Sequence, residues 1–297
     1  MRRYPVVEQK INLELPTFKI YDIVLLGEGE DYKAYLINDT FIFRFPKRKS
    51  VQAGLKKEIV ALPLIRKWLQ VQIPQFDYIS PTLAFVGYQK IIGEELISSS
   101  FYQFPENSKS GIIKSVALFL TSLHSIDLCE IFDAHLETID FKQVYHDDFE
   151  AIRKHVHPSL SVFLQEKIDI AFNSYLNNLN NFDYKPSLLH NDLSGNHILI
   201  NVNDKQVEGI IDFGDMAIGD PDYDLTLLFA EFGENFINKL LQFYNRPNSS
   251  TLIEKLKFFN LANVLLRIQR LIIAKDEHEI KDEMIILQNW ILKYYMY

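Results

Sequence analysis

The sequence contains very little cysteine: Cys129 is the only one among 297 residues. One cysteine cannot form an intrachain disulfide framework or a cysteine-based zinc cluster. The sequence also lacks an uninterrupted run of about 18 to 20 apolar residues, because LANVLLRIQRLIIA, the most apolar stretch near the C-terminus, contains Arg267 and Arg270. These absences exclude a disulfide-stabilised domain and predict a chain without a membrane-spanning helix.

Positive charge is scarce as well. The chain has 31 lysines and arginines against 39 aspartates and glutamates, a formal net charge of −8 and a pI near 5.5. General nucleic-acid binding needs a basic surface, so this charge argues against it. The first residues, MRRYPVVEQKINLELP, have two arginines but no apolar segment behind them, so they do not resemble a secretory signal. We expect a monomer in the cytoplasm with neither a nucleic-acid nor a membrane partner.

What is present is typical of a large globular protein. Hydrophobic residues make up 47% of the chain and charged residues 24%, which allows a sizeable core. In about the first 95 residues, FKIYDIVLLGEGEDYKAYLIN and DTFIFRFPK alternate apolar and polar residues around turn signals, which predicts hairpin strands. KKEIVALPLIRKWLQ has helical spacing, and AFVGYQKIIGEEL predicts a further strand.

From about residue 108 the pattern becomes helical. SGIIKSVALFLTSLHSI predicts a strong helix, 147–181 is largely helical with a break at Pro158, and helical patterns return over 225–245 and 251–296. Two polar motifs lie among strands, because ILI follows HNDLSGNH and QVEGIIDF follows a short turn. This order predicts an α+β fold, with a β-rich first lobe and a mostly helical second lobe.

The two motifs, HNDLSGNHILI and IIDFGD, place polar side chains beside buried strands. A phosphoryl-transfer site positions a nucleotide, holds one or two Mg²⁺ ions and orients an attacking hydroxyl. Asp192 can accept the proton of that hydroxyl, His197 and Asp212 can face the metal, and His190 can brace the loop. Each motif alone is compatible with an ordinary loop. The two together, with a strand–turn–strand between their aspartates, favour catalysis.

HNDLSGNHIL followed by IIDFGDMAIGDPDYDL resembles the aminoglycoside phosphotransferase family, which has a protein-kinase-like fold. Within that family the chain is most similar to the 2''-O-phosphotransferase branch, because FIFRFPK, KKEIVALPL, FVGYQKIIG, SLHSI and the DFGD and GDPDYD segments match it. The resemblance implies two lobes, 1–93 and 94–297, with a hinge near 88–93. It implies one or two Mg²⁺ ions as cofactor, ATP or GTP as phosphate donor, and a cationic aminoglycoside as acceptor, hence antibiotic resistance.

The resemblance also assigns roles to single residues. Asp192 matches the catalytic base, and Asp212 matches the metal ligand that follows the hairpin. Arg44 stands where kinases have the strand lysine, and Glu58 matches its ion-pair partner on a helix. The implied nucleotide contacts are Gly27, Gly29, Arg44, Glu58, Gln89, Lys90, Ile91 and Ile211.

Two positions depart from the general kinase pattern. His197 stands where most kinases have a metal-binding asparagine, although Mg²⁺ prefers oxygen ligands. The second metal ligand is therefore either His197 or its neighbour Asn196. Arg44 replaces lysine, but arginine stays charged and can bind phosphate with its forked head. A surface arginine on a strand is the alternative interpretation of Arg44.

Acidic residues gather after the second motif, where 206–238 contains eight carboxylates and no lysine or arginine. A cleft of one charge sign concentrates an oppositely charged substrate, and aminoglycosides carry several ammonium groups. Asp220 and Asp222 flank a proline turn, and Asp224 can cap the following helix. The predicted acceptor contacts are Asp192, Asp215, Glu231 and Glu234. A solvated acidic helix face is the alternative for the last two.

Three functions remain open at this stage. The predicted one is an aminoglycoside O-phosphotransferase, with the 2'' hydroxyl as its target. The second keeps the reaction but uses a macrolide or a small hydroxylated metabolite, which the thinner acidic cluster and His197 both allow. Arg267 and Arg270 in the late helix also do not suit a purely cationic ligand. The third is a pseudokinase-like binding module, supported only by Arg44 and His197. A protein kinase is disfavoured because no A-P-E segment follows DFG.

Overall fold

The computed structural model describes residues 4–201, 203–245 and 251–296. The chain divides into two compact units. Unit 1 comprises Met1–Leu136 and Asn196–Met216, and unit 2 comprises Glu137–Gly195 and Ala217–Tyr297. These two units are defined by the contacts within each of them and do not coincide with the two lobes that the resemblance implies. The lobe boundary near residue 93 stays a prediction.

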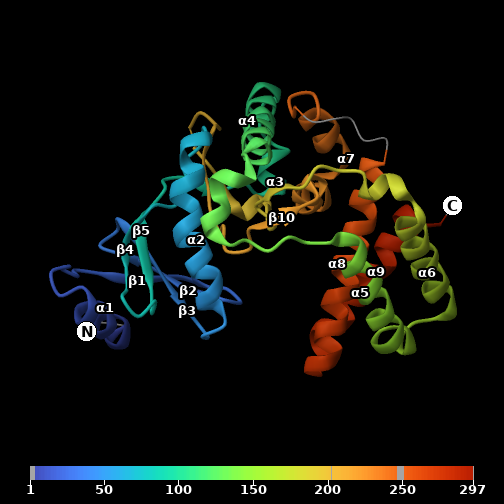
Figure 1. Cartoon of the computed structure of the whole chain (residues 1–297), viewed down its shortest axis with the longest axis horizontal. Helices are drawn as coiled ribbons and strands as arrows, with labels where there is room; N and C mark the ends of the chain where they lie inside the picture. The colour runs from blue at the N-terminus through green and yellow to red at the C-terminus, as the bar shows by residue number, and fades with distance from the viewer. Residues whose placement is uncertain (1–3, 202, 246–250, 297) are drawn as a thin grey trace. The chain divides into compact units, whose positions relative to one another are not determined.

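Unit 1 contains a five-stranded antiparallel sheet (Figure 1). Its strand order is β1-β2-β3-β5-β4, and neighbouring strands are joined by antiparallel ladders. The strands are β1 (Ile23–Glu28), β2 (Tyr32–Ile37), β3 (Phe41–Pro46), β4 (Phe76–Ile79) and β5 (Val86–Gln89). The predicted hairpin strands are confirmed, and β4 was not predicted because its four residues are too short to show an alternation.

Alternation along β2 and β3 gives this sheet two different faces. On one face Tyr35, Phe43 and Phe45 form an aromatic core with helix α1 (Pro5–Glu14), and the rings of Tyr35 and Phe45 meet edge to face at 5.5 Å. On the other face Arg44 points toward helix α2 (Val51–Ile65). The sheet thus separates a packed outer layer from a polar layer on the side of α2.

Unit 1 also includes a three-stranded sheet and further helices. The sheet order is β6-β8-β9, with β6 (Glu94–Glu95), β8 (Ile198–Ile200) and β9 (Val207–Ile210). The remaining helical segments are η1 (Arg66–Trp68), α3 (Ser98–Phe101), α4 (Glu106–Ser125), η2 (Leu128–Ala134) and η5 (Gly195–His197), the last beginning at the end of unit 2. The hairpin β8–β9 lies between Asp192 and Asp212, as the sequence indicated.

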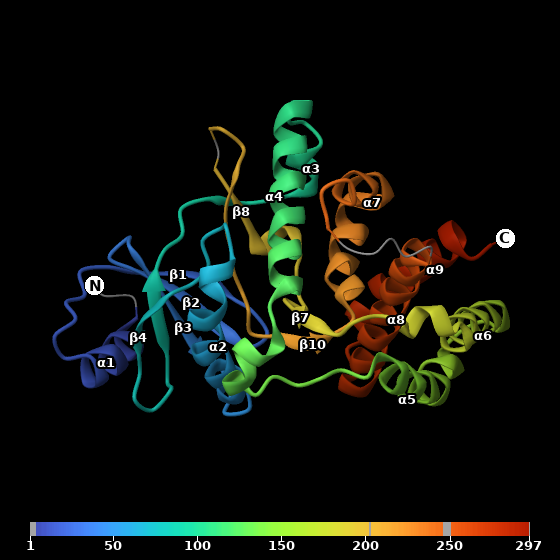
Figure 2. The same cartoon turned by 45° about the horizontal axis from the view of Figure 1, so that its top comes forward.

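Unit 2 is mostly helical, with a short antiparallel pair of strands (Figure 2). The strands are β7 (Ser187–Leu189) and β10 (Ala217–Gly219). The helices are α5 (Phe141–His155), η3 (His157–Ser159), α6 (Val162–Asn177), η4 (Leu179–Phe182), η6 (Pro221–Leu225), α7 (Thr226–Leu240), α8 (Leu252–Ala274) and α9 (Glu277–Tyr294). Aromatic rings join α6 to α8, with Tyr175 stacked on Phe258 at 3.9 Å.

The helical pattern over 251–296 corresponds to two helices. Lys275 ends α8 in the left-handed conformation (φ 58°), and the side chain of Asp276 then caps α9 by accepting from the backbone N–H of Glu279. Among the described residues, no single helix is long and apolar enough to cross a membrane; only α4 and η2, bent by 80°, meet the length and composition requirements as a pair.

Candidate active site

Arg44 and Glu58 form the ion pair that the resemblance implied. Arg44 is 5% exposed, and its Nη1 donates to Oε1 of Glu58 at 2.8 Å. Its Nη2 donates to Oδ1 of Asp212 at 3.2 Å, so one guanidinium joins the sheet, α2 and the second motif. The alternative interpretation of Arg44 as a surface residue is wrong, because β3 turns this side chain toward the interior.

The surroundings of this pair are apolar and aromatic. Glu58 is fully buried, and burial raises the pKa of its carboxyl although Arg44 opposes the shift. Among the described residues, Oε2 of Glu58 has no hydrogen-bond partner. The Arg44 guanidinium lies 4.1 Å from the ring centre of Tyr32, and burial raises the pKa of Tyr88 to about 12. The pair is therefore enclosed by the protein, with one carboxylate oxygen of Glu58 still able to accept a hydrogen bond.

Asp212 lies in the loop after β9 in the left-handed conformation, with φ of 64°. Its side chain is 46% exposed, and Oδ2 lies 3.8 Å from Nε2 of His197. The backbone N–H of Ile211 donates to the carbonyl of His197 at 3.0 Å, which joins the end of the first motif to the second motif within unit 1. The two residues predicted to face a metal are therefore neighbours, whereas Asn196 is exposed beside them.

Carboxylates crowd this part of unit 1. The surrounding protein raises the pKa of Asp215, and the charges of Asp212 and Asp31 raise it further. No group of three or more histidine, cysteine, aspartate or glutamate side chains within the described ranges forms a metal cluster by itself. Mg²⁺ commonly binds to one or two carboxylates and completes its shell with water and substrate phosphates. The crowded carboxylates fit such an ion.

The turn between β1 and β2 corresponds to the predicted nucleotide loop. Nothing lies within 4 Å of the position that a side chain at Gly27 would take, and the N–H of Gly29 donates to the carbonyl of Tyr32 at 3.0 Å. Lys47 holds the turn by donating from Nζ to the carbonyl of Gly29 at 3.1 Å. Arg48 holds it through Asp31 at 2.6 Å. The turn is thus fixed by cations that follow β3.

The predicted hinge follows β5. The N–H of Lys90 donates to the carbonyl of Thr40 at 2.8 Å, so this amide is engaged within the protein. Ile91 is buried against Gly209, whose added Cβ would come within 2.8 Å of the Ile91 side chain. Gln89 is exposed. The contacts of Gln89, Lys90, Ile91 and Ile211 with a nucleotide stay predictions.

The loop that carries Asp192 belongs to unit 2. His190 is fully buried, and its Nδ1 accepts from the backbone N–H of Asp192 at 3.3 Å, so the predicted bracing role of His190 is confirmed. The backbone N–H groups of His190 and Asn191 donate to the two carboxylate oxygens of Asp224 at 2.9 and 2.7 Å. Asp192 itself is half-buried at the end of this braced turn.

Asp224 therefore has another role than the one predicted. We expected it to cap the helix that begins near Leu225, but α7 has no side-chain cap at its N-terminus. The buried carboxylate instead accepts hydrogen bonds from two amides of the loop that carries Asp192, a tertiary contact that local sequence does not reveal. In the sequence, the only sign of this contact was that GDPDYD follows HNDLSGNHILI at a short distance.

Glu231 also supports this loop. The carboxylate of Glu231 accepts from the backbone N–H of Gly195 at 2.7 Å, across 36 residues of sequence. Helix α7 is kinked two residues later at Gly233, where φ is 73°. Glu234 lies beyond the kink and is exposed. Sequence reasoning assigned both glutamates to the acceptor and missed the contact between Glu231 and the loop.

A buried ion cluster stabilises the segment before α7. Oδ1 of Asp220 accepts from the N–H of Asp222 at 3.0 Å, which confirms the predicted turn. Lys255, which is 2% exposed, binds both carboxylates, with Nζ at 2.7 Å from Asp222. Lys255 was missed, because a lysine inside a helical pattern normally lies on the solvated face.

A second acidic feature of unit 2 was missed as well. Burial and the neighbouring Asp147 raise the pKa of Asp148, on α5, to about 6. The charges of Asp192, Asp224 and Asp148 all raise the pKa of Tyr223, although burial is the main cause. The negative charges of these three carboxylates are therefore all felt by the hydroxyl of Tyr223. In the same unit, Nε of Arg267 pairs with Glu283 at 2.9 Å, which offsets the positive charge that seemed unsuited to a cationic acceptor.

Comparison with known proteins covers most of the chain. The family model described as "APH: Phosphotransferase enzyme family" matches residues 22–259, from β1 into α8. The GDP and kanamycin complex of APH(2'')-IIIa shares 30% sequence identity at a TM-score of 0.93, over 97% of this chain and 99% of that chain. ADP-bound aminoglycoside phosphotransferase APH(2'')-Ib shares 28% at a TM-score of 0.76, over 96% and 97% of the two chains.

One similar protein comes from Bacillus subtilis (strain 168). Uncharacterized protein YcbJ is 23% identical over an alignment of 235 residues, and the match covers 73% of this chain and 73% of that protein. The structural likeness confirms the predicted α+β kinase-like fold, with an antiparallel sheet first and helices after it.

Proposed function

The chain belongs to the APH phosphotransferase enzyme family, and on this premise we propose that it transfers the γ-phosphate of ATP or GTP to the 2'' hydroxyl of an aminoglycoside. Membership makes it a nucleotide-dependent phosphotransferase that acts on a small molecule. The observation that carries the proposal is the braced loop around Asp192, which three tertiary hydrogen bonds from Asp224 and Glu231 hold in place.

Asp192 is the general base in this proposal. Its backbone is fixed by His190 on one side and its loop by Asp224 on the other, so the carboxylate keeps one orientation toward an acceptor hydroxyl. The carboxylate takes the hydroxyl proton while the oxygen attacks the γ-phosphorus and the nucleoside diphosphate leaves. Positioning does most of the work in such reactions, and a braced loop provides it.

The polar layer of unit 1 binds the phosphate donor. Arg44 contacts the α- and β-phosphates and stays aligned by Glu58, while the turn with Gly27 and Gly29 covers them. Asp212 holds Mg²⁺, and His197 or Asn196 assists. The ion would neutralise developing charge on the transferred phosphoryl group. One of the similar structures contains GDP and another contains ADP, so the proposal includes both GTP and ATP as phosphate donors.

Cationic acceptors suit the carboxylates of unit 2. Asp148 joins Asp192 as an acceptor contact, because both act on Tyr223 and Asp148 is only partly buried. Glu234 extends the acidic surface of unit 2, and Asp215, in unit 1, stays a predicted acceptor contact. The likeness to a kanamycin complex at 30% identity over nearly the whole chain supports an aminoglycoside.

Product analysis tests this function. The protein is incubated with Mg²⁺ and ATP or GTP, and with kanamycin, gentamicin, tobramycin, a macrolide or choline. Mass spectrometry then detects an added phosphate, and NMR locates it. A 2''-phosphorylated aminoglycoside supports the proposal. If only the macrolide or choline is phosphorylated, the proposed aminoglycoside acceptor is wrong and that compound takes its place. If the protein binds nucleotide but forms no product, it is a binding module.

A further inference from the structure

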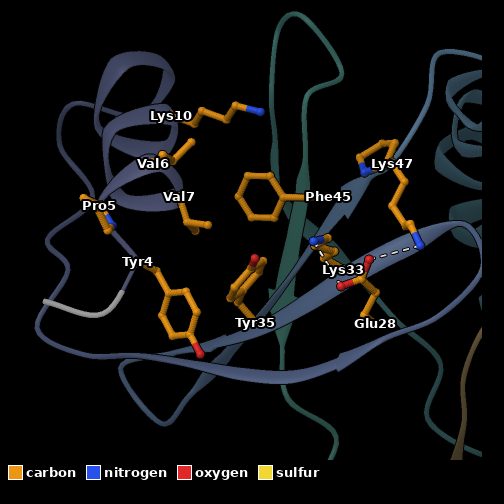
Figure 3. A pocket seen from close by; sticks show the side chains of 11 residues that line it. Tyr4, Pro5, Val6, Val7, Lys10, Glu28, Lys33, Tyr35, Phe45 and Lys47 are labelled. Carbon is orange, nitrogen blue, oxygen red and sulfur yellow. Dashed lines mark ion pairs between the residues drawn. The ribbon is translucent and has the colours of Figure 1, made fainter.

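A cavity of about 530 Å³ lies on the outer side of the five-stranded sheet, where α1 meets β1, β2 and β3. Figure 3 shows Tyr35 and Phe45 in its middle, with Tyr4, Val6 and Val7 from the α1 side. This face is opposite to Arg44, because residues alternate along β3. The cavity is therefore distinct from the polar layer assigned to the nucleotide, and its size is typical of small-molecule sites.

The rim of this cavity is basic. Lys10, Lys33 and Lys47 line it together with a single carboxylate, Glu28, so its local charge is positive in a protein of net charge −8. Oxygens of Glu28 pair with Nζ of Lys33 at 3.0 Å and of Lys47 at 3.1 Å, drawn as dashed lines in Figure 3. Two ammonium groups thus share one exposed carboxylate over an aromatic floor.

We propose that this cavity binds a small molecule with one anionic head on an apolar body. The body lies on Tyr35 and Phe45, and the head binds Lys33 and Lys47 in competition with Glu28. The apolar part gains from leaving water, while a second anion beside paired ammonium groups gains from their charge. Lys10, on the opposite side of Phe45 in Figure 3, adds to the attraction.

Occupation of the cavity acts on the nucleotide turn. Lys47 also donates to the carbonyl of Gly29, and Glu28 is the last residue of β1. An anion that draws Lys47 away removes one of the bonds that hold the turn, so we infer weaker nucleotide binding. This consequence rests on the proposed role of the turn in covering the phosphates, whereas binding in the cavity does not.

Isothermal titration calorimetry with octanoate tests the site directly on the full chain. Octanol and octylamine have the same apolar body with a neutral and a cationic head. We expect saturable binding of octanoate that is at least tenfold tighter than that of octanol and no binding of octylamine. Equal affinities for octanoate and octanol, or no saturable octanoate binding, would overturn the proposal.

Two variants guard against a folding effect. Lys33→Gln with Lys47→Gln removes the anion contacts, and Val6→Asp places a negative charge on a side chain that is 63% exposed in the rim. Both should weaken octanoate binding at least tenfold and leave the circular dichroism spectrum unchanged. Lys19→Gln with Lys49→Gln, two exposed lysines outside the cavity, is the matched control and should bind octanoate like wild type. Equal binding by all three contradicts the site.

The effect on the turn is measured as the Kd of GDP and of ADP with and without saturating octanoate. A Kd raised several-fold in wild type, and unchanged in Val6→Asp, supports the coupling. An unchanged Kd in wild type overturns the coupling but not the site. Neither titration requires an acceptor, so failure to phosphorylate aminoglycosides leaves both results interpretable.

Discussion

Arg44 shows at the scale of a single residue why arginine can replace lysine in this fold. Its forked head reaches Glu58 and Asp212 at once, with Nη1 and Nη2 at 2.8 and 3.2 Å. A lysine has one nitrogen and cannot supply both contacts with the same geometry. Arg44 therefore links α2 to the second motif through a single side chain.

Removing Arg44 should be costly because Glu58 is completely buried. Arg44→Met leaves an unpaired buried carboxylate, which costs about 3 to 5 kcal/mol of unfolding free energy. The double variant with Glu58→Met should recover much of this loss, because no buried charge remains. Urea denaturation of the wild type, both single variants and the double variant measures the cycle. A double variant no more stable than Arg44→Met contradicts the explanation.

Asp148 should make acceptor binding and stability depend on pH in opposite directions. Its folded-state pKa is raised from 3.8 to about 6, so its contribution to stability is present below pH 3.8 and is lost as pH rises through 6. The ionised form attracts a cationic acceptor, so the KM for kanamycin should fall as pH rises through about 6.

The matched variant for this prediction is Asp148→Asn. Relative to wild type, it should gain unfolding free energy at pH 7 by about 1 kcal/mol, a figure reduced for solvent screening, and gain nothing near pH 4. Its KM should change less across pH 6 than that of wild type. If the KM for kanamycin depends on pH in the same way in both proteins, the titrating groups are the amines of kanamycin and not Asp148, which contradicts the prediction.

At the scale of elements, the loop before η5 depends on two neighbours that are distant in sequence. Asp224 contacts Asn191 across 33 residues, and Glu231 contacts Gly195 across 36. Both acidic residues lie in or beside the segment η6–α7, so this segment serves as a support for the loop. A loop held in this way can keep the side chain of Asp192 in one orientation.

Asp224→Asn should lower kcat through misplacement of Asp192. An amide has one oxygen in place of two, so one loop N–H loses its acceptor, at a cost of about 1 to 3 kcal/mol. We expect kcat to fall roughly 10- to 100-fold with little change in the Kd of GDP. Asp183→Asn, at an exposed position of the same unit, is the control and should leave both unchanged. A raised Kd with unchanged kcat contradicts the positioning role.

Elements with a clear period were predictable, and those without one were not. Strands β2 and β3 follow the alternation in the sequence, because Tyr35, Phe43 and Phe45 on one face enter the core beside α1 while Arg44 on the other face points toward α2. Strand β1 is exposed beyond its first residue, Ile23. Helix α1 was missed: only Val7 and Ile11 are buried, so its apolar pattern is weak. The motifs located Asp192 and Asp212, but the supports at Asp224, Glu231 and Lys255 depend on contacts that only the folded chain creates.

At the scale of the whole molecule, charge should influence the encounter with the acceptor. The chain has a net charge of −8, and a polycation is attracted to such a protein at low ionic strength. The KM for kanamycin should rise roughly three- to tenfold between about 0.05 and 0.5 M KCl, where screening shortens to a few ångströms. Sucrose at equal osmolality is the control. A KM unaffected by salt contradicts an electrostatic contribution to binding.

The most direct measurement concerns Asp192. Mg²⁺-dependent turnover of GTP and ATP is followed with and without kanamycin, in wild type and in Asp192→Asn, with GDP binding as a check of folding. We predict turnover stimulated by kanamycin in wild type and a loss of at least about a hundredfold in the variant, with an unchanged Kd of GDP. Stimulated turnover that survives the substitution would contradict the assignment of Asp192 as the base.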